Sequence, residues 1–362
     1  MLFVFRTDVI HSMQDYKEIT LDHIILENTF SPRTVTGLRS MKDGIHYTTL
    51  EGGRQIVKYS YETGEVVDVI FSVKELEENR FSSFSGYEFS DDESMLLITT
   101  GREQIYRHSY RADFYVWDIE TKTLFSLFGE GKEQLATFSP CGRKIAFVFE
   151  NNLYYRNLES GEIVRITSDG RENYVINGAP DWVYEEEFSF NKAFEWSPDG
   201  KKIAFYRFDE SDVKMFNMTI YGELYPHWYS FKYPKAGEEN SLVTIHVYDL
   251  ENEKTVLMDT GDETDQYIPR IKWTKDPGKL CIYRLNRLQN HIELLFADPV
   301  TGSSGIVFSE KNKYFISETG DNFVTFLDDN EHFVIMSERS GWMHFYLYDM
   351  EGDLMKTRNI LL

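Results

Sequence analysis

The stretch Trp196-Ser197-Pro198-Asp199-Gly200-Lys201-Lys202-Ile203-Ala204-Phe205 is typical of a β-hairpin. Its proline fixes one backbone angle of a turn, Asp-Gly closes the turn tightly, and the apolar residues that follow suit a strand. Four weaker copies, each an aromatic residue ahead of a turn and an apolar segment, begin at Phe89, Phe138, Trp273 and Phe326. The chain is therefore a repeat of strand–turn–strand units.

A second pattern, alternating aromatic and polar residues that end in another turn, accompanies several of these copies. It occupies residues 114–121, 153–161, 245–250 and 345–352. Two hairpins per unit make a four-stranded antiparallel blade, and successive units start 49, 58, 77 and 53 residues apart. Repeated strand-only units of this size predict an all-β protein, a β-propeller. The alternative is a pair of stacked β-sandwiches.

An earlier unit at residues 45–64 brings the visible blades to about six. We expect an N-terminal lead-in over residues 1–36 and the propeller domain over residues 37–362. A propeller ring is stable because each blade covers the apolar face of its neighbour. Either the ring closes with six blades or the chain is part of a longer protein.

Composition and charge narrow the range of partners. The 362 residues include 60 Asp and Glu against 38 Lys and Arg, a formal net charge of −22. This balance argues against nucleic acid or an anionic membrane surface as the main partner, and it favours a cationic ligand. No stretch approaches the ~18 apolar residues of a membrane span, and His and Cys lack the spacing of metal ligands. We therefore expect no metal, cofactor or membrane span.

The opening residues Met1-Leu2-Phe3-Val4-Phe5 are fewer than the about 7–15 apolar residues of a signal-peptide core. No signal peptide is therefore visible, and the localisation of the protein is left open at this point.

The spacing of 77 marks an insertion between Arg207 and roughly Ser241. It is rich in aromatic residues: Tyr221, Tyr225, Trp228, Tyr229, Phe231 and Tyr233. An aromatic-rich arm that projects from one blade is either a local cap or a surface for a partner. The residues alone favour neither interpretation.

The stretch Asp181-Trp182-Val183-Tyr184-Glu185-Glu186-Glu187-Phe188 is the strongest candidate site. Successive carboxylates are usually a solvated surface, but here aromatic residues flank them and anchor the segment. Carboxylates held close together repel one another, and a bound ammonium would relieve that repulsion. On a strand Glu186 and Glu187 would point to opposite faces. Convergence on one ligand requires a helical turn or a bulge, and we predict one here.

A second candidate is Arg107, within the irregular stretch Tyr106-Arg107-His108-Ser109-Tyr110. A guanidinium is a planar donor suited to a carbonyl or a carboxylate. The alternative is an ordinary surface ion pair.

These stretches resemble a known family. Residues 181–187 resemble the double-glutamate motif of dipeptidyl peptidase IV and its relatives, prolyl oligopeptidase-type serine peptidases. Residues 107–110 resemble the family's arginine segment, and Tyr233-Pro234-Lys235-Ala236-Gly237 resembles the end of its propeller arm. The three occur in the family's order, and the resemblance extends over roughly residues 47–353, the N-terminal β-propeller region.

The resemblance implies roles for three residues. Glu186 and Glu187 would bind the free N-terminal ammonium of a peptide substrate, and Arg107 would orient a carbonyl near the second residue. Dipeptides with proline or alanine in the penultimate position would then be released. The arm at residues 209–242 would contribute to a homodimer, and a periplasmic or secreted location would be expected.

One departure from the family is large. Its catalytic serine lies on a Gly-x-Ser-x-Gly elbow of a C-terminal α/β-hydrolase domain. No such elbow occurs here, since Gly302-Ser303-Ser304-Gly305-Ile306 fails at the fifth position. The family's ring also has eight blades, which at about 50 residues each need about 400 or more. We therefore expect an incomplete ring without the hydrolase domain, no catalytic residue, and no peptidase activity from the chain alone.

Two other functions remain open. The chain could be a stand-alone propeller that binds peptides or proteins, or a homologue with an inactive catalytic domain.

Overall fold

A computed structural model describes the chain over residues 18–32, 34–76, 80–317 and 319–358. The apolar opening, with the rest of residues 1–17, lies outside the described residues. The chain divides into two compact units. The smaller comprises Met1–Glu51 and Ile56–Val69, and the larger comprises Gly52–Gln55 and Ile70–Leu362.

The smaller unit holds a short π-helix, η1 (Asp22–Leu26), and most of the first antiparallel sheet. That sheet consists of β1 (Arg39–Ser40), β2 (His46–Glu51), β3 (Gln55–Ser60) and β4 (Val66–Ser72), in that order. Tyr47 of β2 stacks on Tyr59 of β3, with ring centroids 5.3 Å apart. This sheet is the early unit expected at residues 45–64.

The larger unit begins its sheets after the 3₁₀-helix η2 (Val73–Glu75). Its first sheet contains β5 (Gly86–Phe89), β6 (Met95–Gln104), β7 (Tyr110–Asp118) and β8 (Thr123–Ser126). The next contains β9 (Gln134–Phe138), β10 (Lys144–Phe149), β11 (Asn152–Asn157) and β12 (Ile163–Arg165). In both, consecutive strands are paired, as in a propeller blade.

Two sheets of the larger unit have five strands. One contains β13 (Val175–Asn177), β14 (Phe194–Trp196), β15 (Lys202–Asp209), β18 (Leu242–Asp249) and β19 (Lys254–Leu257). The other contains β20 (Gln266–Tyr267), β21 (Ile271–Trp273), β22 (Leu280–Asn286), β23 (His291–Ala297) and β24 (Ser304–Lys311). In each, two short strands pair with different parts of one longer strand. The fifth strand therefore arises because the first strand of the blade is interrupted.

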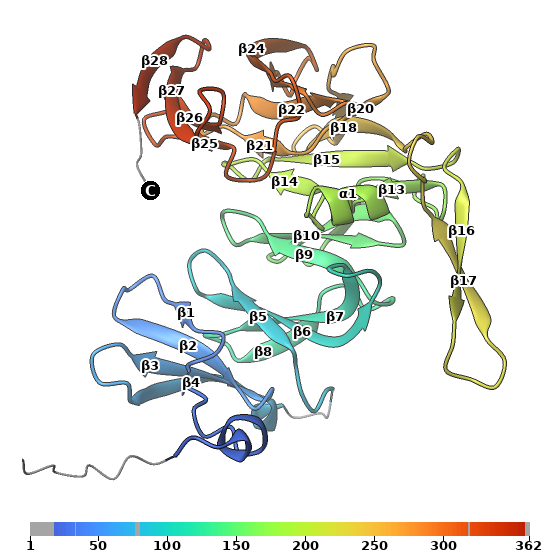
Figure 1. Cartoon of the computed structure of the whole chain (residues 1–362). Helices are drawn as coiled ribbons and strands as arrows, with labels where there is room; N and C mark the ends of the chain where they lie inside the picture. Colours follow the sequence, from blue (N-terminus) through green and yellow to red (C-terminus); the bar gives the residue numbers. More distant parts are fainter. Residues whose placement is uncertain (1–17, 33, 77–79, 318, 359–362) are drawn as a thin grey trace, which may run out of the picture. The chain divides into compact units, whose positions relative to one another are not determined.

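The last sheet contains β25 (Val324–Phe326), β26 (His332–Ser337), β27 (His344–Asp349) and β28 (Leu354–Arg358). A separate two-stranded ribbon, β16 (Met215–Ile220) and β17 (His227–Lys232), lies between β15 and β18 in the chain and is the arm expected from the spacing of 77 (Figure 1). Across the described residues, six antiparallel sheets of four or five strands succeed one another. The predicted all-β fold of propeller blades with one inserted arm is confirmed.

The stretch that predicted the fold forms the turn between β14 and β15. The Ser197 hydroxyl donates to the Asp199 carboxylate over 2.6 Å and accepts from the amide of Lys202 over 2.9 Å. Gly200 has a φ of +66°, in the left-handed region that glycine adopts without strain. Ser-x-Asp-Gly therefore makes the turn both rigid and short, which sets the register of the hairpin.

Candidate functional site

The site begins where the chain leaves its sheet between β13 and β14. Gly178 starts this excursion with a φ of +77°, and the amide of Ala193 returns to the Gly178 carbonyl over 3.1 Å. A side chain at position 178 would place its Cβ 3.0 Å from the Val148 side chain, a tight contact that adds to the backbone's preference for glycine. The excursion contains helix α1 (Trp182–Glu187) (Figure 1).

Asp181 starts α1 as its N-cap. One carboxylate oxygen accepts from the amide of Tyr184 over 2.9 Å, and the other accepts from the Ser241 hydroxyl over 2.6 Å. The cap satisfies an amide that the first helical turn leaves without a partner. Burial raises the pKa of Asp181, and these two hydrogen bonds oppose that rise. The helical turn predicted at the three glutamates is confirmed.

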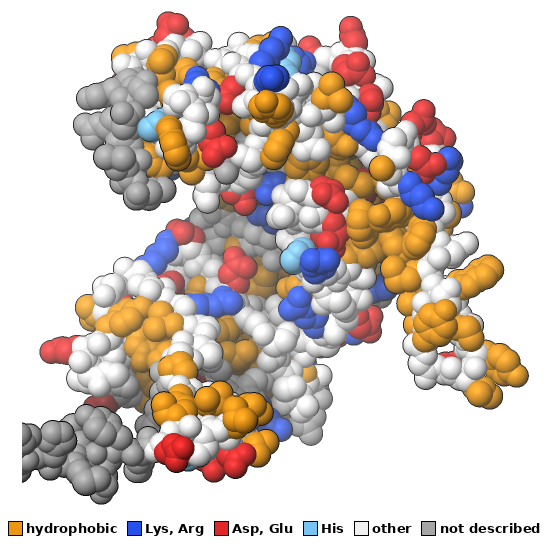
Figure 2. All heavy atoms as spheres, in the orientation of Figure 1, with side chains coloured by type: hydrophobic (Ala, Val, Ile, Leu, Met, Phe, Trp, Pro, Cys, Tyr) orange, Lys and Arg blue, Asp and Glu red, His pale blue; other side chains and the backbone are white. Residues whose placement is uncertain are grey.

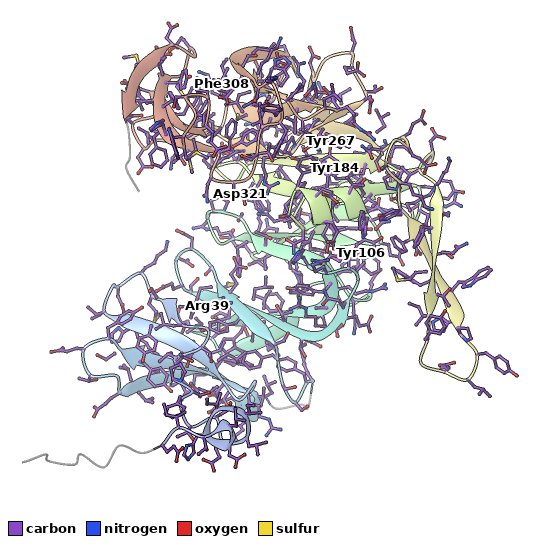
Figure 3. All side chains as sticks on the ribbon, in the orientation of Figure 1. Arg39, Tyr106, Tyr184, Tyr267, Phe308 and Asp321 are labelled. Atoms are coloured by element: carbon purple, nitrogen blue, oxygen red, sulfur yellow. The ribbon has the colours of Figure 1, made fainter. Side chains whose placement is uncertain are left out.

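Tyr184 attaches α1 to the core of the larger unit. It is 1% exposed, and its ring lies 4.9 Å from that of Phe208 and 6.3 Å from that of Tyr267. Tyr184 and Tyr267 are labelled in Figure 3. The phenol oxygen accepts a hydrogen bond from the amide of Ile268 over 3.0 Å, and burial raises the pKa of the phenol. An aromatic side chain held at both its ring and its hydroxyl fixes the rotation of the short helix.

The three glutamates of α1 consequently differ in exposure. Glu185 is 1% exposed, Glu186 is half-buried and Glu187 is exposed. One oxygen of Glu185 accepts from the backbone amides of His108 and Ser109, over 2.7 and 2.9 Å. Hydrogen bonds to a carboxylate are among the stronger ones in proteins. Glu185 therefore binds the β6–β7 hairpin to α1.

The same hairpin carries Arg107, whose Nε lies 3.2 Å from a carboxylate oxygen of Glu186. The structure thus brings together two of the three predicted site residues. Glu187 is the next residue of the helix, and its side chain has no hydrogen bond or ion pair to any other described residue. The guanidinium of Arg107 is 72% exposed and the Glu186 side chain 15%. Both can therefore meet a ligand from solvent.

The tip of the hairpin is held in shape by local hydrogen bonds. The Gln104 amide nitrogen donates to the carbonyls of Tyr106 and Arg107, over 2.6 and 3.0 Å. The Ser109 hydroxyl accepts from the amide of Tyr106 over 3.2 Å. Arg107 therefore projects from a constrained turn, which limits the directions that its guanidinium can take.

The base of the arm contacts both segments that form this site, helix α1 and the β6–β7 hairpin. Trp182 of α1 lies 4.4 Å from Tyr233, and Tyr106 of the hairpin lies 5.9 Å from Phe231, between ring centroids. The rest of the arm is exposed, with hydrophobic side chains along it and at its tip (Figure 2). The base of the arm therefore acts as a local cap on α1 and the hairpin. The tip of the arm does not pack in this way and is exposed to solvent.

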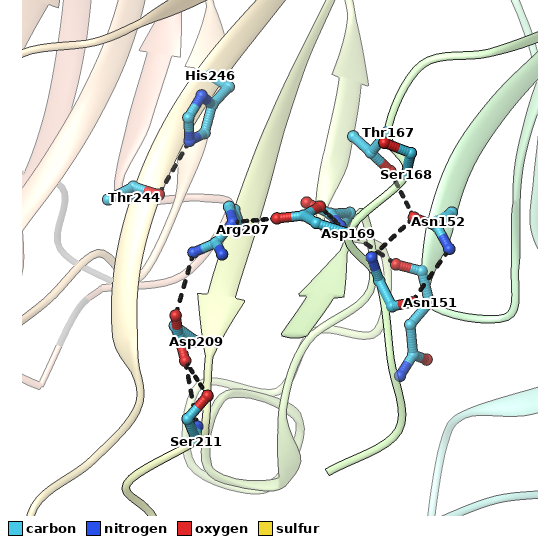
Figure 4. A network of polar contacts seen from close by, with 12 residues as sticks. Asn151, Asn152, Thr167, Ser168, Asp169, Arg207, Asp209, Ser211, Thr244 and His246 are labelled. Atoms are coloured by element: carbon cyan, nitrogen blue, oxygen red, sulfur yellow. Dashed lines mark hydrogen bonds and ion pairs between the residues drawn. The ribbon is translucent and has the colours of Figure 1, made fainter. Parts of the chain in front are cut away.

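A polar network lies where β15 ends and the arm begins (Figure 4). Arg207 donates to Asp169 over 2.8 Å and lies 3.5 Å from Asp209. The Ser211 hydroxyl also donates to Asp209, over 2.6 Å. Burial, with a smaller contribution from the Arg207 charge, lowers the pKa of the nearby His246 to about 4. This imidazole is therefore neutral near pH 7.

The described part of the chain contains no group of three or more His, Cys, Asp or Glu residues placed to hold a metal ion. None of the helices among these residues is long and apolar enough to cross a membrane.

Comparison with known proteins identifies the class of protein. Residues 77–360 match the family described as "Dipeptidyl peptidase IV (DPP IV) N-terminal region". The match covers well over half of the chain, so the chain belongs to this family. The predicted family and the predicted region of it are both confirmed.

Individual relatives agree with this result. The chain is 30% identical to human prolyl endopeptidase FAP, over 82% of the chain and 40% of that protein. It is 30% identical to a probable dipeptidyl peptidase 4 of Trichophyton verrucosum, over 93% of the chain and 46% of that protein. The crystal structure of Porphyromonas gingivalis dipeptidyl peptidase 4 matches with a TM-score of 0.85 and 38% identity, over 94% of the chain and 49% of that structure. The chain thus spans about half the length of these proteins or less.

Sequence reasoning missed two features. It selected Glu186 and Glu187 and gave Glu185 no role, although Glu185 is the buried glutamate of α1 and accepts backbone hydrogen bonds from the hairpin. It also overlooked Glu210, at the base of the arm, which is buried. No local pattern marks either residue, because their environments are made by segments distant in the chain.

Proposed function

We propose that this chain is the substrate-binding propeller portion of a serine-type dipeptidyl peptidase, and that Glu186, Glu187 and Arg107 bind the amino-terminal end of a peptide. The observation that carries the proposal is the pairing of Arg107 with Glu186, 3.2 Å apart, on two segments joined by Glu185. The membership of the chain in the dipeptidyl peptidase IV N-terminal family supports it.

The mechanism follows from the charges. A free N-terminus carries an ammonium with three donors, which two adjacent carboxylates on one helical turn can accept. Arg107 exchanges part of its bond to Glu186 for a carbonyl oxygen of the substrate. Fixing the ammonium and one carbonyl sets how far the peptide extends, so that only the bond after the second residue reaches the cleaving groups. We place those groups outside the 362 residues, in a hydrolase domain of the longer protein.

The test uses the full-length protein and Gly-Pro-p-nitroanilide. Glu186→Ala and Glu187→Ala should each lower kcat/KM by about 100-fold or more, because the ammonium loses a charged partner. The matched control is Glu351→Ala, an exposed carboxylate in the turn between β27 and β28, which should turn over the substrate normally. Near-normal activity of both α1 variants would rule the proposal out. The purified 362-residue chain should bind Gly-Pro peptides without cleaving them.

We also propose that residues 209–242 take part in a homodimer. The supporting observation is the exposure of large side chains at the tip: Tyr221, Leu224, Tyr225 and Trp228 are 79%, 91%, 80% and 72% exposed. Apolar and aromatic surface of this kind is characteristic of interfaces. Sedimentation of the Tyr225→Asp, Trp228→Asp double variant should show monomers where the unmodified protein shows dimers. Unchanged sedimentation would contradict the proposal.

A further inference from the structure

A cavity of about 760 Å³ lies between the β6–β7 hairpin and the base of the arm. Segments from four parts of the larger unit line it, including residues 103–111, 149–151, 170–180 and 229–231. Its volume lies within the range of about 300–1,000 Å³ that is usual for sites of small ligands. Arg107, Glu186 and Glu187 are not among its lining residues, so the function proposed above does not account for it.

Glu210 is the unusual residue of this cavity. It is 7% exposed and lines the cavity, and its carboxylate has no hydrogen bond or ion pair to any described residue. The preceding residue, Asp209, has both Ser211 and Arg207 as partners. A largely buried carboxylate that no protein donor faces is costly, because only the cavity side of the group is left to be solvated or bound. A group that enters the cavity could supply what is missing.

None of the described cations near Glu210 pairs with it. Arg171, which lines the cavity, lies over the ring of Tyr174, 4.0 Å from its centroid. The ammonium of Lys232 donates to the backbone carbonyls of Ser211 and Val213, over 3.0 and 2.6 Å. Lys132 pairs with Glu103 over 2.7 Å, and Arg111 lies 3.6 Å from the same carboxylate. The other charged groups that act on Glu210 are acidic: Asp181, Glu172 and Asp209. The surroundings of Glu210 therefore favour a positive charge.

Burial, reinforced by Asp181, raises the pKa of Glu210 to about 7, against the smaller opposing effect of Lys232. Near neutral pH this carboxylate is thus divided between its protonated and ionised forms. A cation beside it would stabilise the ionised form and release a proton.

The walls of the cavity suit an organic cation better than a metal ion. Tyr106, Tyr229 and Phe231 contribute aromatic surface, and Ser109 and Ser230 contribute hydroxyls. Aromatic faces attract alkylammonium and guanidinium groups. A metal ion would require several oxygen, nitrogen or sulfur ligands, and the described residues offer no such group of three or more.

We propose that this cavity is a binding site for an organic cation, an alkylguanidinium or alkylammonium group that pairs with Glu210 against the aromatic wall. Arginine and lysine side chains carry these groups, as do free polyamines and related amines. The α-amino group of a peptide is not required, so the site operates independently of Glu186 and Glu187.

The probe is N-acetyl-arginine methylamide, whose blocked α-amino group cannot occupy the site proposed for a substrate N-terminus. Calorimetric titration of the 362-residue chain at pH 8 should show binding with a Kd of about 1 mM. Binding should be about tenfold weaker at pH 6, where Glu210 is mostly protonated. At pH 7, titrations in buffers with different ionisation heats should reveal the release of about half a proton per bound ligand.

Two variants and one neutral probe complete the test. Glu210→Gln should abolish binding, and Tyr229→Ala should weaken it about threefold. Tyr229 is 43% exposed, so its removal leaves the core intact. N-acetyl-citrulline methylamide, which has nearly the same shape but no charge, should not bind. The proposal is overturned if the arginine probe does not bind, if citrulline binds equally well, or if folded Glu210→Gln retains affinity. Loss of Gly-Pro-p-nitroanilide turnover on mutating Glu186 is a separate result, so either proposal can fail alone.

Discussion

Glu185 and Glu210 are both buried carboxylates of the larger unit, 1% and 7% exposed, yet they differ in their partners. One oxygen of Glu185 accepts two backbone hydrogen bonds from the hairpin that carries Arg107, while its other oxygen is buried and has no hydrogen-bond partner among the described residues. Glu210 accepts none from the described residues and lines a cavity. Partners, more than depth of burial, distinguish a carboxylate that holds structure together from one that is available to a ligand.

The surroundings of the two carboxylates also differ. Around Glu185, helix and hairpin are joined, and the exposed guanidinium of Arg107 is directed by a rigid support. Around Glu210, the same hairpin and the arm leave a space between them. The base of the arm contacts both regions, through Trp182 with Tyr233 and through Tyr106 with Phe231.

The largest effect is expected at Glu185. Glu185→Ala should lower the free energy of unfolding by about 2–3 kcal/mol, because it leaves the buried amide of Ser109 and the amide of the exposed His108 without an acceptor. Glu185→Gln keeps one carbonyl oxygen in place and should cost about 1 kcal/mol. Urea denaturation of both variants measures the difference. Equal stability of the Ala and Gln variants would contradict a structural role for the two hydrogen bonds.

A second measurement distinguishes a role of Glu185 in positioning Arg107 from a role in stabilising the fold. In the full-length protein, Glu185→Ala should raise KM for Gly-Pro-p-nitroanilide about tenfold, because Arg107 loses its support. Glu185→Gln should recover most of that loss. A variant that is destabilised but has an unchanged KM would show that Glu185 stabilises the fold without positioning Arg107.

The next effect concerns pH at Glu210. The pKa of Glu210 is raised from the ordinary 4.5 to about 7 in the folded protein. At pH values between these two, the folded state therefore keeps a proton that the unfolded state has released. The unmodified protein should therefore lose about 2 kcal/mol of stability as pH rises from 5 to 8. Glu210→Gln should remove this loss, so that its Tm advantage is absent at pH 5 and largest at pH 8. The control is Glu351→Gln, because Glu351 is exposed and is neither a lining residue of the cavity nor among the charges that act on Glu210. A constant Tm difference across this range would contradict the raised pKa.

The sequence predicted the structural features that depend on residues close together in the chain. The blade pattern followed from turn stretches such as residues 196–205, and the helical turn followed from the need of Glu186 and Glu187 to converge. Neither buried carboxylate could be predicted. Glu185 meets its partner His108 across 77 positions of sequence, and Glu210 is enclosed by the hairpin and the arm together. The interrupted first strands of two blades were also missed, because each fragment has only two or three residues.

The smallest expected effect provides the sharpest contrast, because it concerns the residue beside Glu210. Burial alone would raise the pKa of Asp209, but hydrogen bonds from Ser211 and the charge of Arg207 outweigh it and lower the pKa below 3.8. Asp209 thus stabilises the fold above its ordinary pKa, and this contribution is lost as pH falls, opposite in sign to Glu210. Asp209→Asn should lower the free energy of unfolding at pH 7 by less than about 1 kcal/mol, since the side chain is 31% exposed. Its Tm deficit should shrink below pH 4, while that of a Ser211→Ala variant should follow the same course. If the Tm of Asp209→Asn relative to the unmodified protein instead rose with pH, as expected for Glu210→Gln, adjacent partners would not explain the difference between the two carboxylates.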